Sequence, residues 1–354
     1  MEGKNIYKYL DALSNEAHEL QIEHEDKIVI FSDLHMGDGG STDDFKFNAD
    51  LFRTAICEYY NEQGFSLVLN GDVEELQRFS LAKIQNRWKE TYDIFDLFCK
   101  DDRLYKTIGN HDLNLVEPQY SDYPYPLYHA VKLKYKDFIF LVYHGHQASK
   151  RFKKDNELVG FTLKYLANPL RIRNYSVAHD STKKYKIERR AYKYSNYRKI
   201  ASIIGHTHRP LFESMSKPKR LKHTIEQLCR EYISDSGASK NKIKESINSF
   251  KKDLRKIYKD NPDRREVDSL YDNLFQIPCL FNSGCVIGKR GITCLEISNG
   301  EISLIHWFDK NTSKKYLVNS GYDPVQFNGG DFYRMVVNNE KLDYIFARIK
   351  LLAG

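Results

Sequence analysis

The sequence lacks any long hydrophobic run. No apolar stretch approaches the ~20 residues that a helix needs to cross a bilayer, and charged residues make up 29% of the 354 residues. The mean hydropathy is −0.61. The opening segment, MEGKNIYKYLDALSNEAHEL, has no apolar stretch of the kind found in secretory signals. The composition therefore argues against a membrane-spanning or secreted chain, and we expect a soluble cytoplasmic protein.

Cysteine is scarce, and its spacing argues against two kinds of site. The six cysteines contain no Cys-x-x-Cys pair and stand mostly in apolar runs. Such pairs are typical of zinc sites and redox motifs, whereas disulfides are typical of oxidising compartments. We therefore expect reduced core thiols at Cys57, Cys99, Cys229, Cys279, Cys285 and Cys294.

Five short polar clusters occur in a fixed order, each after an apolar run that is typical of a β-strand. The runs are KIVIF, SLVLN, LYKTI, FIFLVY and ASII. Strands that end together bring the residues after them to one edge of a sheet, where α/β proteins form ligand sites. Asp, His and Asn converging there suit a pair of divalent cations. The clusters are Asp33-Leu34-His35, Gly71-Asp72, Gly109-Asn110-His111-Asp112, His144-Gly145-His146 and Gly205-His206-Thr207-His208.

The spacing inside the clusters has a physical reason. Alternate residues at a strand end share one face, so Asp33 and His35 can turn toward the same ion. His206 and His208 repeat that spacing. Two cations about 3.5–4 Å apart need an anion between them to screen their repulsion. Asp72 stands alone after its strand, and we predict that its carboxylate forms this bridge.

The order D-x-H, G-D, G-N-H-D, H-G-H and G-H-T-H resembles the calcineurin-like metallophosphoesterase superfamily. The resemblance covers residues 28–210, with a further piece over 279–307. It implies an α/β fold, a four-layer sandwich in which two central mixed sheets are flanked by helices. It also implies an enzyme that hydrolyses a phosphoester or pyrophosphate bond by attack of a hydroxide held between two divalent metal ions. Nitrogen and oxygen ligands without thiolate favour Mn²⁺, with Fe or Zn²⁺ as alternatives.

The resemblance also implies roles for individual residues. Seven of them would be metal ligands: Asp33, His35 and His208 for the first metal, Asn110, His144 and His206 for the second, and Asp72 as the bridge.

Four further residues are predicted to act on the substrate. His111, of a type with an ordinary pKa near ~6.5, suits protonation of a leaving group or stabilisation of phosphoryl charge. Asp112 either orients His111 or caps the next helix. Arg209 directly follows the last ligand and is a candidate for binding a substrate phosphate. We expect His146 to lie in the wall of the substrate pocket.

One subgroup of the superfamily offers a closer comparison. UDP-2,3-diacylglucosamine pyrophosphohydrolases also carry a helical insertion between the H-G-x and G-H-T-H motifs, and the run HGHQASKRF…LKYLANPLRI looks similar to its start. The sequence departs from that subgroup at His111, where those enzymes typically have Arg, and by the additional segment 214–276. Both departures favour a general metallophosphoesterase over an enzyme for that lipid.

The pattern along the chain predicts a core with attached helical segments. A helix is expected over 76–99 within the core. The predicted divisions are a helical lead-in over 1–26, a core over 27–213 and 277–310 that contains a helical insertion over 147–199, a basic helical insertion over 214–276, and a C-terminal extension over 311–354 that ends in a helix at about 339–352.

The formal net charge of +7 raises the question of an anionic partner. Basic and aromatic residues alternate in the stretch 183–199, between the fourth and fifth clusters. Such a surface can bind nucleic acid by charge and stacking, or an anionic membrane surface. It can equally be the solvated face of a helix. The residues are Lys183, Lys184, Lys186, Arg189, Arg190, Lys193, Arg198 and Lys199, with Tyr185, Tyr192, Tyr194 and Tyr197.

Three functions fit this pattern. The first is hydrolysis of a small phosphorylated metabolite or a nucleotide-type substrate. The second is a nuclease-like phosphodiesterase that acts on DNA or RNA, and the third is a non-catalytic scaffold with the same fold. The complete ligand set favours an enzyme, because a scaffold has no need of all seven side chains.

Overall fold

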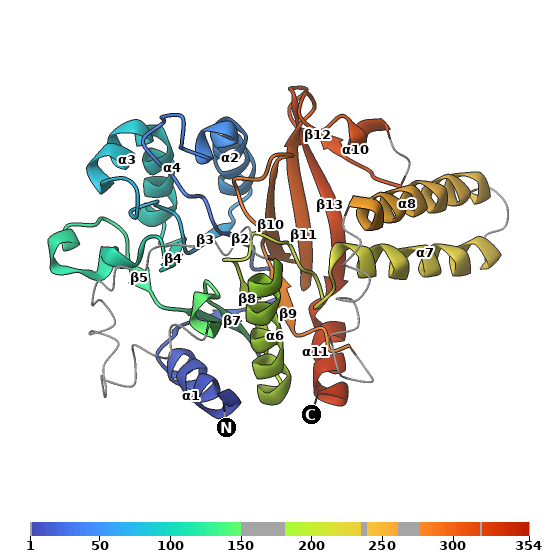
Figure 1. Cartoon of the computed structure of the whole chain (residues 1–354), viewed down its shortest axis with the longest axis horizontal. Coiled ribbons are helices and arrows are strands. Elements are labelled where there is room, and N and C mark those ends of the chain that lie inside the picture. Colours follow the sequence, from blue (N-terminus) through green and yellow to red (C-terminus); the bar gives the residue numbers. More distant parts are fainter. Residues whose placement is uncertain (1, 150–180, 235–238, 261–275, 319–320, 354) are drawn as a thin grey trace.

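The computed structural model describes residues 2–149, 181–234, 239–260, 276–318 and 321–353. Two mixed β-sheets with helices around them form the molecule (Figure 1). The predicted α/β sandwich is therefore confirmed. Over the described residues, no helix is both long and apolar enough to cross a membrane.

The larger sheet has eight strands in the order β12-β13-β11-β10-β2-β3-β4-β5. Strands β2 to β5 are parallel, and each remaining neighbour pair is antiparallel. Their bounds are β2 Ile28–Phe31, β3 Ser66–Asn70, β4 Leu104–Thr107, β5 Leu127–Tyr128, β10 Ile292–Ser298, β11 Glu301–Asp309, β12 Val325–Gln326 and β13 Phe332–Lys341.

The smaller sheet has five strands in the order β1-β6-β7-β8-β9. Strands β7, β8 and β9 run parallel, so the residues that follow them emerge at one edge. The bounds are β1 His18–Ile22, β6 Val131–Tyr135, β7 Phe138–Val142, β8 Ala201–Ile204 and β9 Leu280–Asn282.

The side chains of β2 point alternately to the two faces of the larger sheet and pack into two different buried clusters. Ile28 and Ile30 belong to a buried cluster that also contains residues of β6 to β9. Val29 and Phe31 belong to a second cluster, formed with helices on the outer face of the larger sheet. Because successive strand residues point to opposite faces, one apolar run fills both layers. This anchors the strand that precedes Asp33.

Helices cover the outer side of each sheet. On the larger sheet they are α2 Ala49–Thr54, the π-helical η2 Ala55–Asn61, α3 Leu81–Arg87 and α4 Lys89–Lys100. On the side of the smaller sheet they are α1 Glu2–Asn15, α6 Ser181–Arg198 and α11 Leu342–Leu352. Short helices complete the described chain: η1 Phe45–Phe47, η3 Leu113–Val116, η4 Pro118–Tyr120, η5 His146–Ala148 and α10 Lys315–Val318.

The single helix expected over 76–99 is two helices, α3 and α4, separated at Trp88. This residue has φ −108° and ψ 30°, outside the helical region. Its indole N–H donates to the Gly37 carbonyl at 2.9 Å and to the Asp43 carboxylate at 3.1 Å. The buried ring is thus fixed against the loop after β2, and the helix breaks where the side chain is held.

Both ends of the chain contribute strands that the sequence did not predict. The lead-in over 1–26 contains β1 besides helix α1, and β1 pairs in parallel with β6. Lys132 on β6 donates to Glu19 on β1 at 2.7 Å across this pair. The C-terminal extension contributes β12 and β13, so the last helix begins at Leu342 rather than near 339. β1 thus adds a strand at one edge of the smaller sheet, and β12 and β13 add two strands at one edge of the larger sheet.

The basic insertion over 214–276 contains α7 Lys217–Ser234 and α8 Lys240–Asp260. These two helices pack side by side and project from the body of the molecule (Figure 1). On α8, Phe250 lies against Tyr322, with 5.5 Å between ring centroids, and Asp253 accepts the Tyr322 hydroxyl at 2.8 Å. Residues 235–238 and 261–275 of this insertion, and residues 150–180 of the insertion over 147–199, lie outside the described part of the chain.

Candidate metal centre

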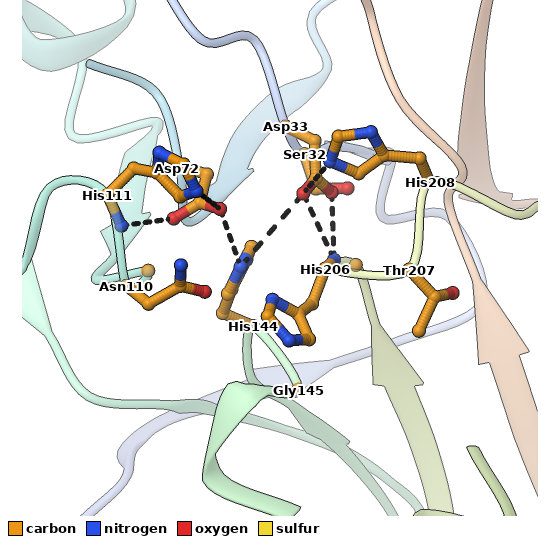
Figure 2. A network of polar contacts seen from close by, with 12 residues as sticks. Ser32, Asp33, Asp72, Asn110, His111, His144, Gly145, His206, Thr207 and His208 are labelled. Atoms are coloured by element: carbon orange, nitrogen blue, oxygen red, sulfur yellow. Dashed lines mark hydrogen bonds and ion pairs between the residues drawn. The ribbon is translucent and has the colours of Figure 1, made fainter. Parts of the chain in front are cut away.

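The five sequence motifs meet at the carboxyl ends of β2, β3, β4, β7 and β8 (Figure 2). Three of these strands belong to the larger sheet and two to the smaller one. The site therefore lies where the carboxyl ends of strands from both sheets come together. All seven predicted ligands lie within this region, in two groups.

The first group is Asp33, His35 and His208. The Nε2 atom of His208 lies 3.0 Å from Oδ1 of Asp33 and 3.1 Å from Nε2 of His35. Nε2 of His35 is 3.9 Å from the same carboxylate oxygen. One ligand atom from each residue lies within 4.8 Å of the other two. Such an arrangement of a carboxylate and two imidazoles can hold one cation.

The second group is Asp72, His144 and His206, whose ligand atoms also lie within 4.8 Å of one another. Nε2 of His144 is 3.1 Å from Oδ2 of Asp72. Asn110 points its amide toward this group (Figure 2). Among the described residues, the buried Oδ1 atom of Asn110 has no hydrogen-bond partner. A cation would satisfy this atom.

Asp72 lies between the two groups. Its Oδ2 atom is 3.1 Å from Nε2 of His144 and 3.9 Å from Nε2 of His35. Its other oxygen, Oδ1, accepts the backbone N–H of His111 at 2.8 Å. One oxygen is thus held by the chain while the other faces both groups. This is the position that a bridging carboxylate requires.

The backbone at five of the ligands has positive φ: Asp33 (55°), His35 (49°), Asp72 (52°), His206 (63°) and His208 (54°). Residues other than glycine adopt this region at a cost, on the order of 1–3 kcal/mol each, and do so mostly at functional sites. Backbone hydrogen bonds hold the loops in place, since the N–H groups of Asp33 and His35 donate to the carbonyls of Gly71 and Asp72 at 3.1 and 2.9 Å.

Gly109 is required by the same close packing of loops. A Cβ atom at this position would lie 2.1 Å from Oδ1 of Asp72. No side chain fits at that distance, so the loop that carries Asn110 can approach the Asp72 carboxylate only with glycine here.

Hydrogen bonds at Nδ1 direct the Nε2 atoms of the histidines into the site. Nδ1 of His144 donates to the Asn70 carbonyl at 2.9 Å, which directs Nε2 toward Asp72. Nδ1 of His35 lies 3.0 Å from Oε2 of Glu75. Acceptors of this kind orient metal-binding histidines and make them more basic.

Glu75 is a residue of the candidate site that the motif pattern missed. Its two carboxylate oxygens bind two histidines, His35 at 3.0 Å and His111 at 2.7 Å. Burial opposes ionisation of this carboxyl, but the hydrogen bonds of His111 and His35 outweigh burial and lower its pKa to about 2. The only feature of the sequence that could have indicated Glu75 is its place in the run GDVEEL, three residues after Asp72.

The electrostatics of the site call for positive charge. Burial alone would raise the pKa of Asp33, but His208 and His144 lower it to about 2. Burial alone would lower the pKa of His144, yet Asp72 and Asp33 raise it to about 10. The protein without metal therefore holds a proton between its buried carboxylates. A cation that binds there displaces such protons, so the residues fit a metal site.

His206 stays neutral for a different reason. Burial, together with the nearby positive charge of His144, lowers the pKa of His206 to about 3. A neutral imidazole is the form that binds metals.

Asp112 does not make the hydrogen bond to His111 that the sequence suggested, because Glu75 makes it. The Asp112 carboxylate instead accepts the backbone N–H of Val73 at 2.8 Å and that of Gly109 at 2.6 Å. It makes no hydrogen bond that caps the following helix. Asp112 therefore joins the loops that carry Asp72 and Asn110.

A buried lysine completes the support around Asp112. The Lys106 ammonium, which is fully buried, lies 3.3 Å from Asp112 and 3.0 Å from Glu74. Glu74 also accepts the hydroxyls of Tyr92 at 2.9 Å and Tyr123 at 2.7 Å. A buried charge needs partners of this kind.

Arg209 contacts a side chain from helix α6. Its guanidinium pairs with Glu188, with Nε 3.1 Å from Oε1. The same fully buried carboxylate accepts the Thr207 hydroxyl at 2.8 Å. Arg209, expected to face a substrate phosphate, thus ties the loop of His206 and His208 to α6.

His146 lies beside the second ligand group. It is buried at the start of η5, and its ring centroid is 5.4 Å from that of His144 and 6.2 Å from that of His206. This position agrees with a residue in the wall of the site.

A model of the calcineurin-like phosphoesterase family matches residues 26–219, more than half of the chain. The chain belongs to this family. A similar solved structure is a conserved uncharacterized protein from Streptococcus pneumoniae TIGR4, described as a predicted phosphoesterase. It is 11% identical, with a TM-score of 0.30, and the match covers 79% of this chain and 89% of that chain. No curated protein matches.

Membership of the family agrees with the resemblance in the motifs. It makes the protein a phosphoesterase in general terms, of a family that depends on divalent metals. The substrate and the number of metals are not fixed by family membership.

Proposed function

We propose that the protein hydrolyses a phosphoester or pyrophosphate bond at a centre of two divalent cations. The observation that carries this proposal is the position of Asp72, whose Oδ2 faces both ligand groups. When bound, two cations lower the pKa of a water between them and offset the charge that develops on the phosphoryl group.

His111 is proposed to protonate the leaving group. Burial lowers its pKa, but the charge of Asp72 and the hydrogen bond to Glu75 outweigh burial and raise it above its usual value. The raised pKa favours the protonated form of the imidazole. Glu75 binds Nδ1, so Nε2 is the nitrogen that can give the proton to a departing alkoxide.

The exposure of the ligands favours a small substrate. Asp33 and His144 are fully buried, and Asp72 is nearly so. The side chains of His111 and His208 are 19% and 15% exposed. A phosphate would reach the centre past these two histidines. We propose a phosphorylated metabolite or a nucleotide-type molecule, whose phosphate is accessible at one end.

A nucleic-acid substrate has less support from α6. Three tyrosines of the basic and aromatic stretch, Tyr185, Tyr192 and Tyr194, are buried, whereas Tyr197 is 58% exposed. Buried rings cannot stack on bases. Contact of the exposed lysines of α6 with an anionic surface stays a proposal.

Substitution of the bridging residue tests the proposal. Turnover of p-nitrophenyl phosphate and bis(p-nitrophenyl) phosphate is measured with Mn²⁺, Zn²⁺ and Fe²⁺, together with metal content per chain. We expect hydrolysis by the wild type and a loss on the order of 10³-fold or more in Asp72→Asn, because one bridging charge disappears.

The matched control is Asp137→Asn, which removes the same charge from an exposed position in the turn between β6 and β7. It should keep wild-type activity. Absence of turnover with every metal and ester would instead support a non-catalytic scaffold. Wild-type activity in Asp72→Asn would rule out the bridge.

A further inference from the structure

A cavity of about 310 Å³ opens beside the metal ligand His208. Most of its wall comes from the loop between β9 and β10, in particular residues 285 and 288–291. Pro210, which follows the last motif, lies on the other part of the wall. The cavity and the candidate metal centre therefore share His208.

The loop that lines the cavity is a fixed turn with the sequence Gly-Lys-Arg-Gly. The N–H of Gly291 donates to the Gly288 carbonyl at 3.2 Å, and Gly291 has φ +113°. A Cβ atom on Gly291 would lie 2.1 Å from the Trp307 carbonyl oxygen. The Arg290 carbonyl accepts the hydroxyl of Ser313 at 2.9 Å and Nε2 of His306 at 3.0 Å. The backbone is thus held on several sides.

This turn exposes two cations to solvent at the cavity. Lys289 and Arg290 are exposed, and neither forms an ion pair with a carboxylate of the described residues. Their position differs from that of Arg209 and Arg334, each of which pairs with a carboxylate. The positive charges at Lys289 and Arg290 are therefore available to a ligand.

Lys217 adds a further positive charge near the turn. Burial lowers the pKa of His306, which donates to the Arg290 carbonyl, to about 4; this hydrogen bond opposes the shift, and the charges of Lys217 and Arg290 add to it. Lys217 is the first residue of α7. A positively charged cavity wall beside a phosphoester site favours an anionic part of the substrate.

We propose that Lys289 and Arg290 bind a second phosphate group of the substrate, while the first phosphate is hydrolysed at the metal centre. The substrate class is then a phosphoester that carries another phosphate a short linker away. Lysine and arginine are the side chains that bind phosphate oxygens best, arginine through paired N–H groups. This inference rests on the proposed function, because it assigns the reacting phosphate to that centre.

Alkanediol bisphosphates of two to six carbons test the proposal, each beside the alkyl monophosphate of the same length. Binding to the Mn²⁺-loaded protein is measured by calorimetry, with the heat of metal–ligand mixing subtracted, and inhibition of nitrophenyl ester turnover is measured in parallel. At the best linker length, we expect the wild type to bind the bisphosphate at least about tenfold tighter than the monophosphate. In Lys289→Gln/Arg290→Gln this ratio should fall toward one.

The matched control is Lys100→Gln/Lys350→Gln, which removes two exposed charges from the ends of α4 and α11. It should keep the wild-type ratio. A ratio near one in the wild type at every length overturns the proposal, and so does an unchanged ratio in the Lys289/Arg290 variant. Circular dichroism establishes that each variant is folded.

The two proposals fail separately. Tighter binding of the bisphosphate without turnover of any ester would reject the hydrolytic function and keep the second phosphate site. Turnover without discrimination between bisphosphate and monophosphate would reject the second phosphate site alone.

Discussion

Glu75 shows how much of this site depends on single residues outside the motifs. One carboxylate accepts from His35, a candidate metal ligand, and from His111, the candidate acid. Both histidines therefore have their orientation set by the same group. A change at Glu75 should disturb metal binding and proton transfer together.

Glu75→Gln is expected to lower kcat by about 10–100-fold, because the amide has one acceptor oxygen in place of the two oxygens that bind the two histidines. Bound metal should decrease as well. Both quantities are measured with p-nitrophenyl phosphate and by metal analysis of the purified protein.

Two comparisons make this test specific. Glu75→Asp keeps the charge and should recover part of the activity, whereas Glu226→Gln, at an exposed position on α7, should have no effect. A wild-type kcat in Glu75→Gln would show that the carboxylate does not position these histidines.

At the scale of elements, helix α6 is joined to the loop that follows β8. Glu188 on α6 accepts from Thr207 and Arg209, which flank His208 in the sequence. Asn282 at the end of β9 donates to the Gly205 carbonyl and to the Thr207 hydroxyl, at 2.9 Å each. Helix α6 is thus part of the support of the candidate metal centre.

Glu188→Gln should lower kcat by up to about tenfold and reduce stability, because the partly buried Arg209 guanidinium loses its charge partner. The measurements are kcat and KM for a nitrophenyl ester and the midpoint of urea unfolding. Glu62→Gln, at the exposed end of η2, serves as the control. If Glu188→Gln loses stability but keeps kcat and metal content, then Glu188 supports only the packing of α6.

At the scale of the whole molecule, the candidate metal centre lies between two sheets. The candidate ligands come from loops after β2, β3 and β4 on one sheet and after β7 and β8 on the other. Without a cation, the two buried carboxylates and the strained residues around them are held by hydrogen bonds and by the charge of His144. Metal binding should therefore stabilise the complete fold rather than one loop.

Saturating Mn²⁺ is expected to raise the melting temperature by about 5 °C relative to protein treated with a chelator. A ligand present at 100 times its Kd stabilises the folded state by about 2.7 kcal/mol, which corresponds to a shift of roughly this size for a chain of a few hundred residues. Differential scanning calorimetry measures the shift. It should be much smaller in Asp72→Asn, and an equal shift in that variant would place the metal elsewhere.

The motif residues could be found from sequence because their spacing follows from local geometry. Ligands that directly follow apolar strands must emerge at a sheet edge, and this principle alone brought Asp33, Asp72 and His206 to one place. Glu75, Glu188 and Lys106 could not be found in this way. Their roles depend on which distant loop or helix they contact.

The breaks and additions in the fold have a similar explanation. Helical periodicity continues through Trp88, but the hydrogen bonds of its indole to Gly37 and Asp43 end the helix there. Strand β1 is short and partly polar, so its own sequence only weakly indicates a strand, and its pairing with β6 holds it in this conformation. Contacts between distant segments decided both cases.

The sequence by itself determined the strands of the core and the ligand motifs at their ends, because apolar alternation and turn residues act over a few neighbouring positions. The tertiary structure alone decided which groups surround those ligands. The partners of the histidine Nδ1 atoms, the contacts of buried Lys106, and the placement of Lys289 and Arg290 near His208 all involve segments distant in the sequence. These segments come together only when the chain folds, so no local pattern predicts the contacts.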